Sequence, residues 1–202
     1  MDHGDLLIYA VHVAFWSAFG VADKFASRRS GPSSSRATEP VAINERETVS
    51  PFAKRVVAVH MVAFGIMYFG VGSAAIPQRV PEWFTGQRLV GAAIIMAGAW
   101  IAAWARVWFH SWRFQAKLDA GHQLATGGPF KFMRHPIYMG LNLLALGTAI
   151  WIPTGICWIG FILMVLGSDL RARAEEKVLT DAFGTRYTTY CAATRRFIPL
   201  IY

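Results

Sequence analysis

Residues 89–109 read LVGAAIIMAGAWIAAWARVWF. A single charged side chain, Arg106, lies close to the end of this run. A helix needs about 20 predominantly apolar residues to cross the hydrocarbon core of a bilayer. An arginine near the end of such a helix can extend its charged head group to the interface. The run therefore predicts a helix that spans a membrane.

Four further apolar runs surround this one. Residues 6–22 and 56–76 contain no Lys, Arg, Asp or Glu, and the shorter runs 137–152 and 156–167 are separated by a Pro-Thr-Gly turn at 153–155. Only 16% of the residues are charged, compared with about 25% in an average soluble domain. We therefore predict an all-α fold: a polytopic transmembrane helical bundle of about five spans, the last two a short helical hairpin, with a cytosolic C-terminal helical tail.

The positive charges indicate an orientation. Lys and Arg concentrate in residues 23–55, in residues 113–134 and from residue 171 onward, and the N-terminus and the 153–155 turn have none. Because cytoplasmic loops of membrane proteins are enriched in Lys and Arg, we expect an integral, multi-pass protein with the N-terminus outside and the C-terminus and active site on the cytosolic face. We therefore attribute the net charge of +8 to Lys and Arg in cytoplasmic loops, and we do not expect a nucleic-acid partner. The acidic N-terminus, with no small-residue cleavage site after the first run, argues against a removable signal peptide.

The chain divides into two regions. Residues 1–109 form an N-terminal transmembrane region that includes a linker, 23–55, predicted to be mobile because its centre is polar and almost without aromatic residues. Residues 110–202 contain the polar motifs. The two cysteines, Cys157 and Cys191, are far apart, and the histidines lack the spacing of a metal site, so neither a disulfide framework, a metal centre nor a di-iron oxidase is expected. No glycine-rich loop follows a strand, which argues against a Rossmann methyltransferase.

Several short polar motifs lie in the second region. A glycine turn at 126–130 precedes an Arg-His-Pro-Ile-Tyr run at 134–138, in which the proline suits the first turn of a helix. Arg171 and Glu175, four residues apart, share one helix face. Each motif also has an ordinary structural interpretation, as an interhelical turn, a helix start or a solvated ion pair. The aromatic residues near the end would ordinarily anchor an amphipathic tail at the interface.

The order of these motifs is more specific than any one of them. Residues 121–140 read GHQLATGGPFKFMRHPIYMG, and an apolar hairpin, an acidic pair at 175–176, Phe-Gly-x-x-Tyr at 183–187 and Thr-x-Arg-Phe-Ile-Pro at 194–199 follow. This order closely resembles the signature of the isoprenylcysteine carboxyl methyltransferase family over about residues 110–200. The resemblance implies an integral membrane S-adenosylmethionine-dependent methyltransferase.

Carried over motif by motif, the resemblance also implies a site. The catalytic residues would be Arg171, Glu175 and His135, with Arg171 binding the methyl acceptor. One departure is Phe130, where the family usually has tyrosine and a hydroxyl contact is lost. The residues implied to bind S-adenosyl-L-methionine are Gln115, His122, Gln123, Leu124, Ala125, Gly128, Phe130, His135, Pro136, Ile137, Tyr138, Glu175 and Glu176.

The chemistry of methyl transfer suits such residues. It is an in-line displacement that depends on alignment and needs no metal. A carboxylate acceptor is already ionised at neutral pH, so Arg171 would only orient it. An amine or thiol acceptor would have to lose a proton, for which His135 is the candidate base. O-methylation of a lipophilic or small carboxylate is therefore the main hypothesis. Phospholipid N-methylation, small-thiol S-methylation and a non-catalytic membrane scaffold are the alternatives.

Overall fold

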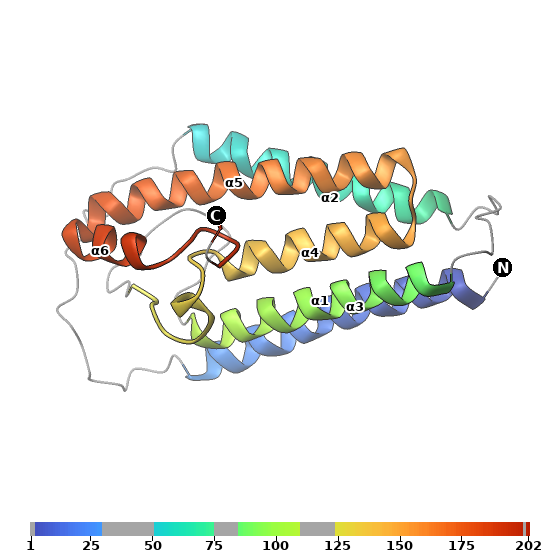
Figure 1. The fold of residues 1–202 in the computed structure, drawn as a ribbon, viewed down its shortest axis with the longest axis horizontal. Helices are drawn as coiled ribbons and strands as arrows, with labels where there is room; N and C mark the ends of the chain where they lie inside the picture. Colours follow the sequence, from blue (N-terminus) through green and yellow to red (C-terminus); the bar gives the residue numbers. More distant parts are fainter. Residues whose placement is uncertain (1–2, 30–50, 75–84, 110–123, 200) are drawn as a thin grey trace.

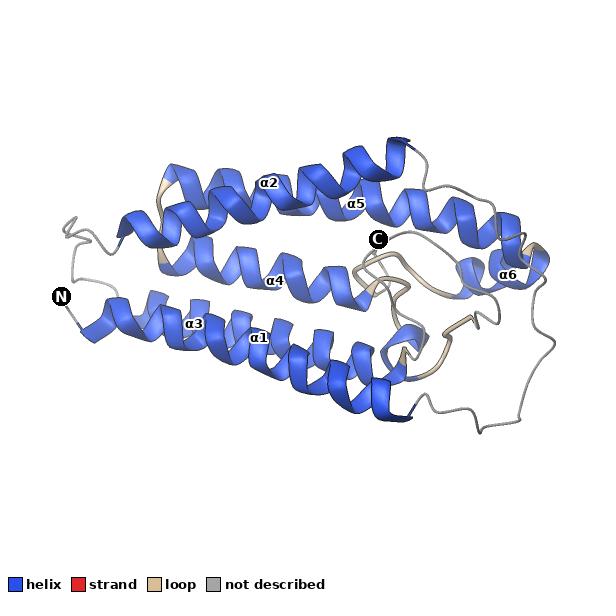
Figure 2. Ribbon diagram, turned by 180° about the vertical axis from the view of Figure 1, so that it is seen from behind, coloured by secondary structure: helices blue, strands red, loops and turns tan. Residues whose placement is uncertain are grey.

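The computed structural model describes residues 3–29, 51–74, 85–109, 124–199 and 201–202, and the regular secondary structure of these residues is helical (Figure 2). This confirms the predicted all-α fold class. The helices are α1 (His3–Arg29), α2 (Pro51–Ala74), α3 (Thr85–Trp108), the short 3-10 helix η1 (Gly128–Lys131), α4 (Pro136–Trp151), α5 (Gly155–Phe183) and α6 (Thr185–Ala193).

Three of the described helices are long and apolar enough to cross a membrane, namely Arg55–Ser73, Gly86–Trp108 and Gly155–Phe183, and Pro136–Trp151 is a shorter apolar helix. The chain is therefore a multi-pass membrane protein. Helix α1 contains the predicted first span, 6–22, but is not one of these three. The count of five spans stays a prediction.

The predicted hairpin of α4 and α5 is uneven. Helix α4 has 16 residues, whereas α5 has 29 and continues well beyond the apolar run 156–167. The apolar run 156–167 is therefore only the first part of α5. Its polar second half, rich in Ala, Arg, Leu and Glu, has high helix propensity and continues the helix, as the sequence predicted for the residues after the last span. The helix ends at Gly184, whose φ of 52° is a left-handed conformation that favours glycine.

The helices form a bundle in which α4 lies between two pairs. Helices α1 and α3 run side by side on one side of α4, and α2 and α5 pair on the other (Figure 1). The N-terminus and the α4–α5 turn lie at one end of the bundle, and η1, α6 and the C-terminal segment lie at the opposite end. The polar motifs are therefore brought together at this second end, which we call the site end.

Helices α3 and α4 touch backbone to backbone through two pairs of glycines. A Cβ atom added to Gly91 would lie 2.7 Å from the carbonyl oxygen of Gly147, and one added to Gly98 would lie 2.7 Å from that of Gly140. In each helix the two glycines are seven residues apart, two turns, and so share one face. Small residues of this kind let transmembrane helices approach closely and pack by van der Waals contact. We call these four residues the glycine interface.

A buried hydrogen-bond chain joins α1, α4 and α2. The Thr148 hydroxyl donates to the Leu144 carbonyl at 2.7 Å, so it can only accept from Nε2 of His12, 3.0 Å away. The other ring nitrogen of His12, Nδ1, must then accept from the Tyr68 hydroxyl at 3.3 Å. Trp16 in turn donates to the Tyr68 oxygen at 2.5 Å. Both nitrogens of His12 are therefore satisfied, as a polar residue buried in a membrane requires.

The predicted linker 23–55 is shorter than expected. Helix α1 continues to Arg29 and α2 begins at Pro51, so both ends of that range are helical, and residues 30–50 lie outside the described residues. The extension of α1 is fixed by an ion pair in which Nε of Arg106 lies 2.6 Å from a carboxylate oxygen of Asp23. This pair joins α1 to α3 at the site end.

Candidate functional site

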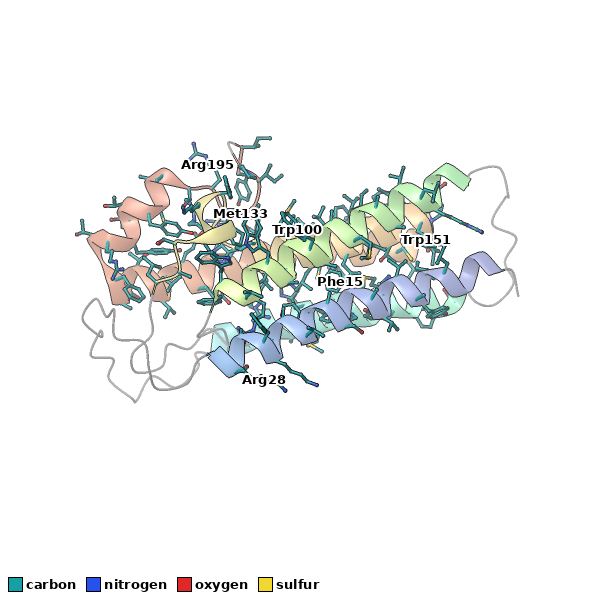
Figure 3. The ribbon with its side chains drawn as sticks, turned by 90° about the horizontal axis from the view of Figure 1, so that it is seen from below. Phe15, Arg28, Trp100, Met133, Trp151 and Arg195 are labelled. Carbon is teal, nitrogen blue, oxygen red and sulfur yellow. The ribbon has the colours of Figure 1, made fainter. Side chains whose placement is uncertain are left out.

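The segment before α4 is held by the end of the chain. The backbone N–H of Arg134 donates to the carbonyl of Arg195 at 2.8 Å, and that of His135 donates to the carbonyl of Arg196 at 3.1 Å. Met133 and Arg195 form the accompanying bridge and lie close together in Figure 3. The position of the Arg-His-Pro motif is therefore set by residues about 60 positions later in the chain.

The glycine turn packs against a tryptophan. Gly128 has a φ of 56°, and a Cβ atom there would lie 2.6 Å from the ring of Trp108. The turn places Phe130 in a buried position, where its carbonyl accepts a hydrogen bond of 2.7 Å from the Tyr190 hydroxyl. The close approach of Trp108 therefore leaves no room for a side chain at either glycine.

A pocket opens at the site end between the segment before α4, α5 and α6. It encloses about 530 Å³, a volume that includes open solvent. Eight residues implied by the resemblance line it: Leu124, Ala125, Phe130, His135, Pro136, Ile137, Tyr138 and Glu175. Two others, Gly128 and Glu176, are not among the lining residues, and Gln115, His122 and Gln123 lie outside the described residues.

The acidic pair splits into two different environments. Glu175 faces the pocket, where the Tyr138 hydroxyl donates to its Oε1 and Nδ1 of His135 lies 3.6 Å from its Oε2. Glu176 is turned to the other side, where Nε of Arg134 lies at 2.9 Å and Nη2 of Arg196 at 2.7 Å. Glu175 can therefore meet a ligand, and Glu176 holds the wall of the pocket.

Glu176 belongs to a network of charges that ties the C-terminal segment to α5. Arg196 bridges Glu176 and Asp169, with Nη1 2.9 Å from the Asp169 carboxylate. The Tyr202 hydroxyl also donates to Asp169 at 2.8 Å. We call this network the charged end, and its members are Arg134, His135, Asp169, Glu176 and Arg196.

His135 lies between the two glutamates. Its Nε2 is 3.2 Å from Glu176, and its Nδ1 faces Glu175. Burial by itself would lower the pKa of His135, but hydrogen bonds and charges from Glu175 and Glu176 outweigh burial and raise that pKa above its usual value. Both ring nitrogens therefore face carboxylates, and the raised pKa favours the protonated form of His135.

Arg171 lies one turn of α5 before Glu175, on the membrane side of the pocket wall. Its guanidinium is 5.1 Å from the centre of the Tyr138 ring, and its Nη2 is 3.9 Å from Oε1 of Glu175. The residue is only 4% exposed and is not among the residues that line the pocket. Arg171 therefore packs directly behind two residues of the pocket wall, Tyr138 and Glu175.

The sequence did not indicate five residues of the pocket wall: Phe109, Arg134, Leu179, Tyr187 and Tyr190. Two of them were interpreted as packing aromatics of the tail, although Tyr187 closes the Phe-Gly-x-x-Tyr motif. A spacing of three places Tyr187 and Tyr190 on one face of α6, and that spacing could have indicated them. The pocket is thus walled largely by aromatic and apolar side chains, with the Glu175 carboxylate at one side. No group of metal-binding side chains occurs among the described residues.

Comparisons with known proteins find similarity to methyltransferases. The phospholipid methyltransferase family model matches residues 87–186. Protein-S-isoprenylcysteine O-methyltransferase of Schizosaccharomyces pombe is 30% identical over 117 residues, which cover 57% of this chain and 46% of that protein. The protein of the same name from Saccharomyces cerevisiae is 33% identical over 89 residues, 43% of this chain and 37% of that protein. Protein-S-isoprenylcysteine O-methyltransferase B of Arabidopsis thaliana is 29% identical over 117 residues, 57% of this chain and 55% of that protein.

The chain thus combines a helical membrane bundle, an aromatic pocket at one end and similarity to methyltransferases. Among these it resembles the isoprenylcysteine carboxyl methyltransferase family. It spans about half the length of the curated relatives that it matches.

Proposed function

We propose that this protein is a membrane enzyme that transfers the methyl group of S-adenosylmethionine to the carboxylate of a lipophilic acceptor. The observation that carries the proposal is the arrangement around Tyr138. Glu175 faces the pocket on one side of this ring, and Arg171 lies over the ring, one helical turn closer to the membrane. A donor bound in the pocket and an acceptor bound at Arg171 would meet at Tyr138.

The pocket suits S-adenosylmethionine, which supplies a methyl group on a positively charged sulfur. The aromatic faces of Phe130, Tyr138 and Tyr187 favour a cation by about 0.5 to 2 kcal/mol at such contacts. The Glu175 carboxylate can accept hydrogen bonds from the ribose or the amino group. The other lining residues named above would surround the rest of the molecule.

The acceptor is proposed to be a carboxylate for two reasons. The curated relatives are named for O-methylation of protein S-isoprenylcysteine. In addition, Arg171 is a permanent cation beside the pocket wall, whereas His135 already holds its protons between Glu175 and Glu176. A carboxylate needs no base, so an oriented guanidinium is sufficient.

The protein would contribute to the rate mainly by alignment. Fixing donor and acceptor in line can supply roughly 7 to 11 kcal/mol of the barrier. Arg171 and Tyr138 are buried, so water would be excluded from the reacting groups. The polar network behind Glu176 would keep His135 and the start of α4 in place while the ligands bind.

We also propose that residues 110–202 form the catalytic region and that the site end faces the cytosol, with the N-terminus outside. The positive charges on Lys24, Arg134, Arg186 and Arg195 lie toward the site end, in agreement with the preference of Lys and Arg for cytoplasmic segments. Labelling of a single cysteine introduced at Arg186 with an impermeant reagent, in sealed vesicles of known orientation, tests this arrangement. Reaction from the outside would contradict it.

Binding of labelled S-adenosylmethionine to the purified protein tests the cofactor. We expect binding that Glu175→Ala abolishes and that Asp181→Ala, at an exposed site on the same helix, leaves unchanged. A folded sample that binds no cofactor would refute the proposal.

Turnover tests the acceptor. Membranes given labelled cofactor and an S-prenylated N-acetylcysteine should accumulate a base-labile methyl ester. Label found only in base-stable lipid amines would favour N-methylation, and cofactor binding without any turnover would favour a non-catalytic scaffold.

A further inference from the structure

The exposed face of α5 changes from apolar to charged within one helical turn. Ile162, Leu166 and Leu170 are 53%, 52% and 37% exposed and follow one another at spacings of four residues. Arg173 and Lys177 continue the same stripe at spacings of three and four, and both are exposed. In a helix that spans a membrane, such a change marks the boundary between the hydrocarbon core and the head groups. This boundary therefore lies between Leu170 and Arg173.

The C-terminal segment is tied to α5 at this level. The Tyr202 hydroxyl donates to Asp169 at 2.8 Å and accepts from Nη2 of Arg173 at 3.0 Å. The chain turns back from α6 toward the bundle, so its end lies beside α5 and the start of α4 (Figure 1). The segment is therefore placed at the level of the membrane surface and not in the water beyond it.

Large apolar side chains are exposed at this level. Ile201 is 76% exposed, Ile198 42% and Phe132 56%. Phe132 precedes Met133, which forms the backbone bridge with Arg195, so the residues after η1 and the C-terminal segment lie side by side. Apolar side chains that face outward at the level of the head groups are suited to insertion into a bilayer surface.

The same two segments carry positive charges that they do not offset themselves. Residues 124–135 and 193–202 contain four Lys and Arg and no Asp or Glu. Arg134 and Arg196 are paired with Glu176. Lys131 and Arg195 are exposed and have no ion pair among the described residues. This surface is therefore apolar with two free cations, which complements a bilayer that contains anionic phospholipid.

The surface is joined directly to the wall of the pocket. The carbonyls of Arg195 and Arg196 accept hydrogen bonds from the backbone N–H groups of Arg134 and His135. Both Arg134 and His135 line the pocket. A contact that fixes the C-terminal segment at the membrane therefore also fixes this part of the wall.

We propose that Lys131, Phe132, Arg195, Ile198 and Ile201 form a docking surface for a bilayer that contains anionic phospholipid, and that docking stabilises the pocket wall. The apolar side chains enter the head-group region, and the two cations contact lipid phosphates. Cofactor binding is then tighter in anionic membranes than in neutral ones. The inference rests on the proposed function only for this cofactor measurement. The cytoplasmic leaflet is negatively charged, so docking there agrees with the proposed orientation of the site end.

The first experiment measures where Ile201 lies. A protein with Cys191→Ser and Ile201→Cys is labelled at position 201 with a fluorophore and placed in nanodiscs of phosphatidylcholine and phosphatidylglycerol, in which both faces are open to water. We expect quenching by lipids that carry a spin label near the head group, and protection from aqueous iodide. Thr189→Cys in the same background, exposed on α6, is the control and should be quenched by iodide. Equal iodide quenching at the two positions overturns docking to the bilayer and indicates a surface for a water-soluble partner.

The second experiment compares the Kd of S-adenosylmethionine in nanodiscs of phosphatidylcholine alone and of phosphatidylcholine mixed with phosphatidylglycerol. We expect about fivefold tighter binding in the mixed discs, because a cation near an anionic surface contributes about this factor. Lys131→Gln combined with Arg195→Gln should bring the ratio of the two Kd values to near one. Lys24→Gln combined with Arg186→Gln removes the same charge from α1 and α6, which lie outside the docking surface, and should leave the ratio as in the wild type.

The outcomes separate this inference from the proposed function. Equal Kd values in the two kinds of disc overturn the inference and leave the proposed function standing. A ratio that the control pair lowers as much as the docking-surface pair does the same, because the effect is then one of net charge. Absence of cofactor binding in every disc refutes the proposed cofactor, and the iodide measurement at position 201 still decides whether the surface docks on the bilayer.

Discussion

The glycine interface and the charged end hold the same helix, α4, by opposite means. Along the apolar length of α4, contact with α3 is made by glycines whose added Cβ atoms would lie 2.6–2.7 Å from the opposing carbonyls, and no charge takes part. At the start of α4, the chain is held by five charged or protonated side chains and by backbone pairing with residues 195–196.

The difference follows from the surroundings of each region. Within a bilayer a charge is costly, and lipid tails give apolar side chains no preference for one another, so close van der Waals contact has to stabilise the helix pair. At the site end, water can solvate the partly exposed ion pairs, so charged side chains can hold the backbone segments in place. The protein thus has a rigid, neutral bundle and a polar end that responds to pH and substitution.

Glu176→Ala should have the largest effect, because it leaves Arg134 and Arg196 facing one another without their shared carboxylate. Removal of one member of a buried network costs about 3 to 5 kcal/mol. Glu176 is partly exposed, so we expect the lower part of this range. The melting temperature in detergent should fall and cofactor binding should be lost, whereas Asp181→Ala should do neither. Wild-type stability in Glu176→Ala would contradict the role given to the charged end.

Gly147→Ala tests the glycine interface. A Cβ atom at this position would lie 2.6 Å from the Gly91 carbonyl oxygen, so α3 and α4 would have to separate. Overpacking of this kind costs about 1 to 3 kcal/mol, measured as denaturant unfolding in micelles. Gly72→Ala is the matched control, because nothing lies within 4 Å of an added Cβ there, and it should be neutral or stabilising. Equal effects of the two substitutions would refute the close contact.

Thr148→Val should have a smaller effect within the bundle. The change removes the acceptor of the His12 Nε2 proton while it preserves side-chain shape. Hydrogen bonds between transmembrane helices contribute about 0.6 kcal/mol on average and at most about 1.7. Unfolding in micelles should show a loss of this size, and the exposed Thr189→Val should show none. A loss of several kcal/mol would mean that the hydrogen-bond chain through His12 stabilises the bundle more than an ordinary interhelical hydrogen bond does.

The effect of pH on local stability should be the smallest of these effects. It should be seen at the charged end and not at the glycine interface. The pKa of His135 is raised above its unfolded value of about 6.5, so its contribution to stability is full below that pH and is lost as pH rises through the folded pKa. Hydrogen exchange, corrected for its intrinsic pH dependence, should therefore show that residues 134–139 and 195–197 lose protection above about pH 6.5. Helices α3 and α4 near the glycine interface should not change. His135→Gln should remove the dependence, and an equal response in both regions would contradict the comparison.

Much of the fold could be predicted because its cause is local. Apolar runs of sufficient length predicted the helices, and the high helix propensity after Gly167 predicted that α5 continues into its polar half. The apolar runs by themselves did not show how far α1 and α5 extend, because polar residues continue both helices. The pairing of Asp23 with Arg106 is an example: 83 positions separate the two residues, so no local pattern indicates it.

The site was predicted only in part, for a similar reason. Adjacent glutamates look equivalent in a sequence, but they point to different sides of a helix, and only the structure places Glu175 in the pocket and Glu176 against Arg196. The sequence indicated a glycine turn, but only the structure shows that Trp108 packs against it.

The sequence by itself determined the membrane character, the all-α class and the order of motifs that defines the family, because hydrophobic length and motif spacing are properties of the chain. Only the tertiary structure decided that the C-terminal segment holds His135 and that Tyr187 and Tyr190 complete the pocket. These contacts join helices that lie far apart in the chain. Their geometry depends on how the bundle packs, which no single segment specifies.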